Sequence, residues 1–125
     1  MKNPSFLLVP LFALGFAGTA QAEDDRPDHF KGEPSATLDQ AMANFSQYNR
    51  QLGEILAKDE LGPEDTAKIH ELTYTLENAL AKIKDGVEVL EESLEAVHVS
   101  SERFELDVVR AEGARYLDTA AKLAK

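Results

Sequence analysis

The chain has 125 residues, with 13 Lys and Arg against 23 Asp and Glu, a net charge of −10 and no Cys. The length predicts a single domain. The lack of Cys excludes disulfides, Cys-ligated zinc or iron–sulfur sites and covalent attachment of a c-type haem. The acidic balance argues against a nucleic-acid surface or a polybasic membrane patch, because both need clustered Lys and Arg.

Residues 1–22 have the three parts of a cleavable export signal. Lys2 gives a positive start, residues 6–17 read FLLVPLFALGFA, and Ala-Gln-Ala precedes a predicted cut between Ala22 and Glu23. The apolar run is shorter than the roughly 20 residues that a membrane-spanning helix needs. We therefore expect a periplasmic or secreted protein without a stable membrane anchor after signal cleavage.

The next segment, residues 23–35, reads EDDRPDHFKGEPS and contains two Pro, one Gly and alternating charge. This composition predicts an extended or disordered leader. From residue 36 to residue 125 the sequence has the pattern of a helical domain.

The first predicted helix covers residues 37–58. Its start is marked by a T-x-x-Q capping box at Thr37 to Gln40, in which two side chains satisfy free backbone amides. Apolar residues then recur at spacings of three and four, which predicts an amphipathic helix: Leu38, Met42, Phe45, Tyr48, Leu52 and Ile55.

The second predicted helix, residues 63–100, is about twice as long as the others. Gly62 suits the boundary before it, and Pro63 suits its first turn. Its apolar stripe follows a heptad pattern typical of coiled coils, with one stutter: Ile69, Leu72, Leu76, Leu80, Ile83, Val87, Leu90, Leu94 and Val97. A third helix, residues 105–124, is expected after a turn within 99–106.

Short connections make successive helices antiparallel, so the fold class is all-α with three up-and-down helices and a long central one. The lengths allow two arrangements. All three helices pack side by side as a three-helix bundle, or the first and third lie end to end along the second. The latter leaves part of an apolar stripe uncovered and favours a homodimer that forms a four-helix bundle.

Glu95 and His98 have the E-x-x-H spacing of di-iron helical bundles and are the weak candidates for a metal site. Such a site needs two of these motifs and two further inward Glu residues, whereas this chain has one motif. Glu95 also lies well outside the apolar stripe. A solvated pair at the edge of the helix is therefore the favoured interpretation.

Met42 and His70 are weak candidates for cofactor binding, together with His98. A Met early in the first helix matches the arrangement of b-type haem bundles, but the last helix has no His as second axial ligand, so core filling is favoured. His70 and Tyr74 lie one turn apart and could form a ligand or partner surface. The favoured alternative is a helix–helix contact.

The sequence has no P-loop, no G-x-G-x-x-G, no G-x-S-x-G and no EF-hand calcium loop. We expect no enzyme activity and no cofactor. The predicted role is that of an exported interaction protein that binds a protein partner or itself and binds no nucleic acid. The alternative function is a four-helix-type metal- or haem-binding protein.

Three segments resemble a known family: RPDHFKGEPSATL at 26–38, IHELTYTLENAL at 69–80 and RAEGARYL at 110–117. The family consists of small exported helical proteins of Gram-negative bacteria and is classed as a domain of unknown function. The resemblance covers residues 26–120, implies an exported helical domain and assigns no site residue. A weaker likeness to cytochrome b562-type bundles covers size, signal peptide and helix pattern, and lacks the C-terminal His.

Overall fold

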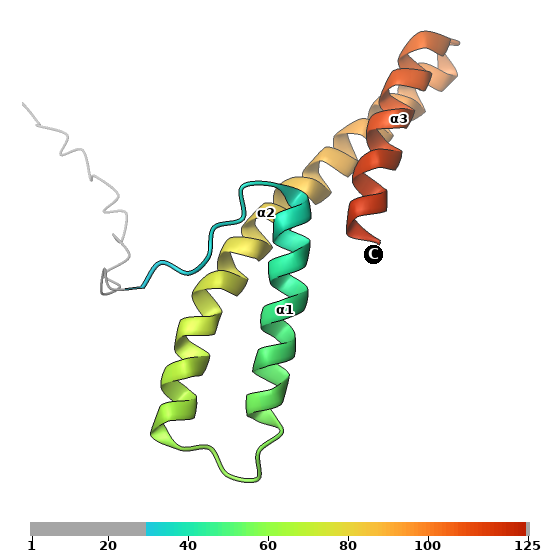
Figure 1. Cartoon of the computed structure of the whole chain (residues 1–125). Coiled ribbons are helices and arrows are strands. Elements are labelled where there is room, and N and C mark those ends of the chain that lie inside the picture. The colour runs from blue at the N-terminus through green and yellow to red at the C-terminus, as the bar shows by residue number, and fades with distance from the viewer. Residues whose placement is uncertain (1–29, 125) are drawn as a thin grey trace, which may run out of the picture.

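The computed structural model describes residues 30–124, which form three α-helices and no strand (Figure 1). Helix α1 spans Leu38–Leu56, α2 spans Pro63–Glu102 and α3 spans Leu106–Leu123. The all-α prediction is confirmed, and each helix end agrees with its predicted position within two residues. The predicted export signal and its cut lie outside the described residues. No helix in the described part of the chain is long and apolar enough to cross a membrane.

The capping box predicted at the start of α1 is present. The hydroxyl of Thr37 accepts a hydrogen bond from the backbone N–H of Gln40 at 3.2 Å, and the Gln40 side-chain oxygen accepts from the N–H groups of Thr37 and Ala36. These bonds satisfy amides that lack a partner within the helix. The sequence of this turn therefore fixes where α1 begins.

The connection from α1 to α2 is held by one carboxylate. Asp65 accepts a hydrogen bond from the N–H of Gly62 at 3.1 Å and forms a 2.5 Å ion pair with Lys58. The hydrogen bond from Lys58, followed by that from Gly62, holds the pKa of Asp65 below its usual value of 3.8. Pro63 occupies the first turn of α2, as expected.

The turn between α2 and α3 contains a residue with unusual backbone geometry. The N–H of Phe104 bonds to the carbonyl of Ser101, and the N–H of Glu105 bonds to the carbonyl of Ser100. This pair of bonds is a Schellman motif, whose penultimate position takes a left-handed conformation and usually holds Gly. Phe104 has φ of 59° there, and its side chain is 84% exposed.

Helices α1 and α3 lie end to end along the same side of α2, so the second of the two predicted arrangements is the one found (Figure 1). Leu38, at the start of α1, packs over Gly86 near the middle of α2. Thr119 and Lys122, near the end of α3, border the same hollow. Thus α1 covers the first half of α2, and α3 covers the second half.

The buried line of α2 coincides with the predicted apolar stripe only at its start, where Leu72 and Leu76 are buried. Residues at strict seven-residue intervals face α1 and α3, and all five are buried: Leu72, Ala79, Gly86, Ser93 and Ser100. Four of these five residues are small. The large residues one position further along each heptad are exposed instead: Leu80, Val87 and Leu94. Small side chains let the helix backbones approach closely, and this outweighs the higher hydrophobicity of the neighbouring line.

Candidate interaction surface

One flank of the α1–α2 pair is covered by residues 30–36, which we call the N-terminal clasp (Figure 1). Glu33 donates its backbone N–H to the hydroxyl of the fully buried Thr75 at 2.9 Å. The side-chain amide of Asn78 donates to the carbonyls of Lys31 and Glu33, each at 3.0 Å. On α1, Asn44 donates to the carbonyl of Pro34. The part of the predicted leader that is described is thus extended and docked.

Gly32 allows the N-terminal clasp to approach the backbone of α2. Its φ of +68° lies in the left-handed region that side chains other than Gly rarely adopt. A Cβ atom at this position would lie 2.6 Å from the backbone nitrogen of Thr75 and 2.7 Å from the carbonyl carbon of Tyr74. No substitution fits without moving the clasp away from α2.

His70 and Tyr74, the candidate ligand surface, lie beside the N-terminal clasp. The Tyr74 hydroxyl and the Nε2 atom of His70 share a hydrogen bond of 3.2 Å, and the two rings are 5.1 Å apart, edge to face. The Phe30 ring lies 5.8 Å from Tyr74. These contacts give Tyr74 a role in docking the clasp, so its neighbour is an extended segment and not another helix.

The opposite flank of α2 carries an apolar line that the described chain leaves largely open. We call it the α2 seam, which alternates at spacings of four and three: Leu76, Leu80, Ile83, Val87, Leu90, Leu94 and Val97. Leu80, Val87 and Leu94 are 49%, 42% and 50% exposed. Leu76 is buried and the other three are half-buried, because their inner sides contact α1 or α3.

Exposed apolar residues of α3 extend the α2 seam. Gly113 lies against Val97 of the seam, since a Cβ atom on Gly113 would lie 4.0 Å from a Val97 methyl group. Leu106 and Leu117 share that flank of α3, because intervals of seven and four residues return to nearly the same helical angle. Both side chains are exposed. The other flank of α3 is polar and carries an ion pair from Arg115 to α2.

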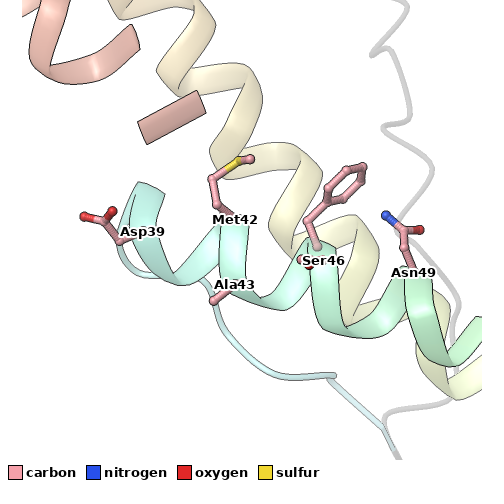
Figure 2. Close-up of a pocket in the computed structure, with 6 residues that line it drawn as sticks. Asp39, Met42, Ala43, Ser46 and Asn49 are labelled. Carbon is pink, nitrogen blue, oxygen red and sulfur yellow. The ribbon is translucent and has the colours of Figure 1, made fainter. Parts of the chain in front are cut away.

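The flank of α1 on the seam side is also apolar. Asn44 bonds to the N-terminal clasp and so marks the clasp flank, and the helical angle places Met42, Phe45 and the exposed Leu56 on the other flank. A hollow of about 670 Å³ runs along this flank (Figure 2). Its lining residues are Asp39, Met42, Ala43, Phe45, Ser46 and Asn49.

Ionisable residues border the outer edge of the α2 seam at intervals of seven: Glu77, Lys84, Glu91 and His98. Lys84 is exposed and lies 4.0 Å from Glu88, and His98 is exposed and lies 3.4 Å from Glu102. Exposed pairs of this kind contribute little to stability. Their side chains can therefore exchange these partners for others at small cost.

The candidate metal and cofactor residues lie apart. His98 pairs with Glu102, one turn further along α2, and Glu95 is exposed. Since Leu38 packs over Gly86, antiparallel packing places Met42 beside residue 82, and His70 is then roughly 18 Å away along α2. Within residues 30–124, no three His, Asp or Glu side chains gather closely enough to hold a metal ion.

These features define a class of small all-α proteins in which one long helix carries two shorter helices end to end. The chain belongs to the family of unknown function DUF6746, which matches residues 1–125. The resemblance to a domain of unknown function is therefore confirmed. Neither a curated protein nor a solved structure matches the chain. The likeness to cytochrome b562-type bundles has no support in these comparisons.

Sequence reasoning did not find the N-terminal clasp. It expected part of an apolar stripe to be uncovered in the end-to-end arrangement, but it did not separate the exposed line of α2 from the buried one. A signal for the buried line of α2 was present, because small residues recur at strict seven-residue intervals beside the large ones. A hydrophobicity pattern ranks Leu above Ser and Gly, and so it points to the wrong line when close helix approach decides which face is buried.

Proposed function

We propose that this protein is an exported, non-enzymatic interaction module that binds another protein helix along the α2 seam. The observation that carries this proposal is the run of exposed apolar side chains at Leu80, Val87 and Leu94, spaced seven residues apart. Scattered exposed apolar residues are ordinary on soluble proteins, but a contiguous apolar line marks a contact surface.

The spacing of the α2 seam also indicates the kind of partner. Apolar residues alternating at three and four form the ridge that a second helix covers in a coiled coil or four-helix bundle. The seam extends from Leu76 to Val97, roughly 30 Å along the helix. A partner with a matching amphipathic helix fits this surface better than a small molecule, which binds in an enclosed pocket.

Export rests on the N-terminal sequence, with its positive start, apolar run and small residues before Glu23. Expression of the full chain in a Gram-negative host and fractionation of the cells test this part. We expect the protein in the periplasmic fraction or the medium, with the intact mass of a chain that begins at Glu23. Uncleaved protein in the cytoplasm contradicts it.

Site-specific photo-crosslinking in these cells tests binding. A benzoylphenylalanine residue replaces Leu94 in the α2 seam or, as a control, Val108 on the polar flank of α3. We expect adducts from position 94 and none from position 108, because only the seam is covered by a partner. Equal adduct formation at both positions, or none at either, contradicts the proposed function.

A further inference from the structure

We propose that the partner helix is α2 of a second copy of this chain, packed antiparallel so that Val87 meets Val87 of the second copy. This inference rests on the proposed function and names its partner. Because Val87 lies at the centre of the α2 seam, a two-fold axis there pairs each apolar layer with another. Leu80 meets Leu94 of the second copy, and Ile83 meets Leu90.

Charge complementarity along the seam edge selects the antiparallel orientation. In an antiparallel pair with its axis at Val87, Lys84 lies opposite Glu91 of the second copy, and Glu77 lies opposite His98. Each pairing occurs twice because of the symmetry. In a parallel pair, each residue lies at the same level as the same residue of the second copy. The ionisable edge of one seam then lies opposite the inner edge of the other, which contains only the buried line of small residues.

The end-to-end placement of α1 and α3 makes this dimer two four-helix bundles. A two-fold axis perpendicular to α2 keeps the covering helices on one side and exchanges the two ends of the molecule. The half of α2 covered by α1 then lies beside the half of the second copy that is covered by α3. Each end contains four helices, the arrangement in which every apolar flank is covered.

The same operation matches the apolar flanks of the shorter helices. Thr119 and Lys122 lie near Gly86, so Leu117 lies close to the level of Leu90. The two-fold axis places Leu117 at the level of residue 84 of the second copy, close to Met42 of that copy. The hollow along α1 thus receives the exposed Leu117 side chain.

The available area meets the requirement of a stable dimer. A specific interface buries about 800 Å² on each partner. The α2 seam alone is a strip about 30 Å by 10 Å and is too small. With the flanks of α1 and α3, the face is about 20 Å wide along the roughly 60 Å of α2. This is enough surface for a specific interface.

The first test is the mass in solution of protein purified after expression of the full chain, measured by light scattering at tens of micromolar. We expect twice the mass of the chain that begins at Glu23. Val87→Asp places two unpaired carboxylates at the axis and should raise the dimer dissociation constant by at least about 100-fold. Val108→Asp is the matched control, since Val108 is also 42% exposed, and it should leave the dimer intact.

Cysteine cross-linking tests the orientation, and any disulfide comes from the introduced residues because the chain has no native Cys. We expect a mixture of Leu80→Cys and Leu94→Cys proteins to give a disulfide-linked heterodimer, whereas Leu80→Cys protein alone gives little product. Efficient linkage of Leu80→Cys protein with itself indicates a parallel pair and overturns the proposal.

A charge exchange tests the register. Lys84→Glu and Glu91→Lys should each weaken the dimer about 10-fold, since each replaces two attractions with two repulsions. The double variant should restore wild-type affinity. Lack of rescue overturns the assigned register.

The outcomes separate this inference from the proposed function. A monomeric wild-type mass together with adducts from position 94 to a different protein overturns the dimer and leaves the interaction module standing. An adduct at twice the chain mass supports both. Absence of adducts and of self-association overturns both.

Discussion

The two halves of α2 are covered in different ways. In the half covered by α1, the buried side chains are mostly apolar: Ala41, Ile55, Leu72, Leu76 and Ala79, with Thr75. In the half covered by α3, the buried residues are small and polar: Ser93, Ser100 and Thr119. Gly86, between the two halves, is buried against Leu38 of α1. Every buried large apolar side chain in residues 30–124 therefore belongs to the first half.

The two halves are therefore stabilised by different interactions. Burial of apolar area contributes about 25 cal/mol per Å², which favours the first half. The hydroxyls of the second half bond within their own helices, Ser93 to the carbonyl of Val89 at 2.6 Å and Thr119 to that of Arg115 at 3.0 Å. These bonds satisfy the hydroxyls and add no link between α2 and α3. The second half depends on close backbone packing and gains most from a partner.

The largest expected effect comes from the core of the first half. Leu72→Ala should lower the free energy of unfolding by about 3 kcal/mol, because it removes a buried side chain and leaves a cavity. Ser93→Ala, at the equivalent heptad position of the second half, should change it by less than about 1 kcal/mol, since the hydroxyl hydrogen-bonds only to carbonyls of its own helix. Urea unfolding at one fixed protein concentration measures both.

A loss at Ser93→Ala as large as at Leu72→Ala contradicts the contrast between the halves. Such a result would mean that the hydroxyl, and not the small volume, is what α3 requires at this position. Ser93→Leu then provides the complementary measurement. It should destabilise strongly, because a large side chain would force α3 away from α2.

The N-terminal clasp covers only the first half, and Gly32 is its most restrictive residue. Gly32→Ala should lower the free energy of unfolding by about 2 kcal/mol, because the Cβ atom collides with α2 and the hydrogen bonds to Thr75 and Asn78 are lost. Gly53→Ala is the control, since a Cβ there meets nothing within 4 Å. Because Gly53 lies in the last turn of α1, this substitution should stabilise by up to about 1 kcal/mol.

Hydrogen exchange followed by mass spectrometry gives a second measure of the same change. The N–H of Glu33, which bonds to Thr75, should lose its protection in Gly32→Ala and keep it in Gly53→Ala. Retained protection of this amide in Gly32→Ala contradicts the assigned role of the glycine.

A smaller effect of opposite sign is expected at the turn beyond the second half. Phe104→Gly should raise the free energy of unfolding by about 1 kcal/mol, because Gly adopts the left-handed conformation without strain and the exposed ring contributes little burial. Phe104→Ala retains the strained backbone and should give no such gain. Thermal unfolding of the two variants, compared with wild type, decides between strain and side-chain contact as the cause.

The smallest expected effect concerns the loop that closes the first half. The pKa of Asp65 is lowered in the folded protein, so its ion pair with Lys58 stabilises above the unfolded value of about 3.8 and is lost as the pH falls through the lowered pKa. Asp65→Asn should therefore flatten the fall in stability as the pH drops below about 4. An unchanged slope in Asp65→Asn, measured by urea unfolding at several pH values, contradicts a stabilising ion pair at this position.

Local signals predicted the helices well. The capping box at Thr37, the Gly62–Pro63 boundary and the turn within 99–106 are determined by residues next to one another in the chain, and all three are confirmed. The apolar spacing gave the helix lengths for the same reason. Those lengths in turn limited the fold to two arrangements.

The choice between neighbouring lines of α2 depends on contacts between distant segments. Leu80 and Ala79 are adjacent in the sequence, and only the approach of α1 decides that Ala79 faces inward. The N-terminal clasp was beyond reach for a related reason, because it docks mainly through backbone carbonyls and one backbone N–H. These groups are the same at every residue, so the sequence pattern around Gly32 does not reveal them.

The end-to-end placement of α1 and α3 creates a junction between the two short helices at the middle of α2. Helix α3 runs toward the middle of α2, and α1 continues from there in the same direction, so the negative end of one helix dipole meets the positive end of the next. The pKa of Lys122 is raised by its hydrogen bond to Asp118 and, more weakly, by the charge of Asp39 across this junction. The protein thus has the outline of a two-helix hairpin, in which α2 is one arm and α3 followed by α1 forms the other. Anything fused after α3 leaves from its middle, beside the start of α1, and not from either tip.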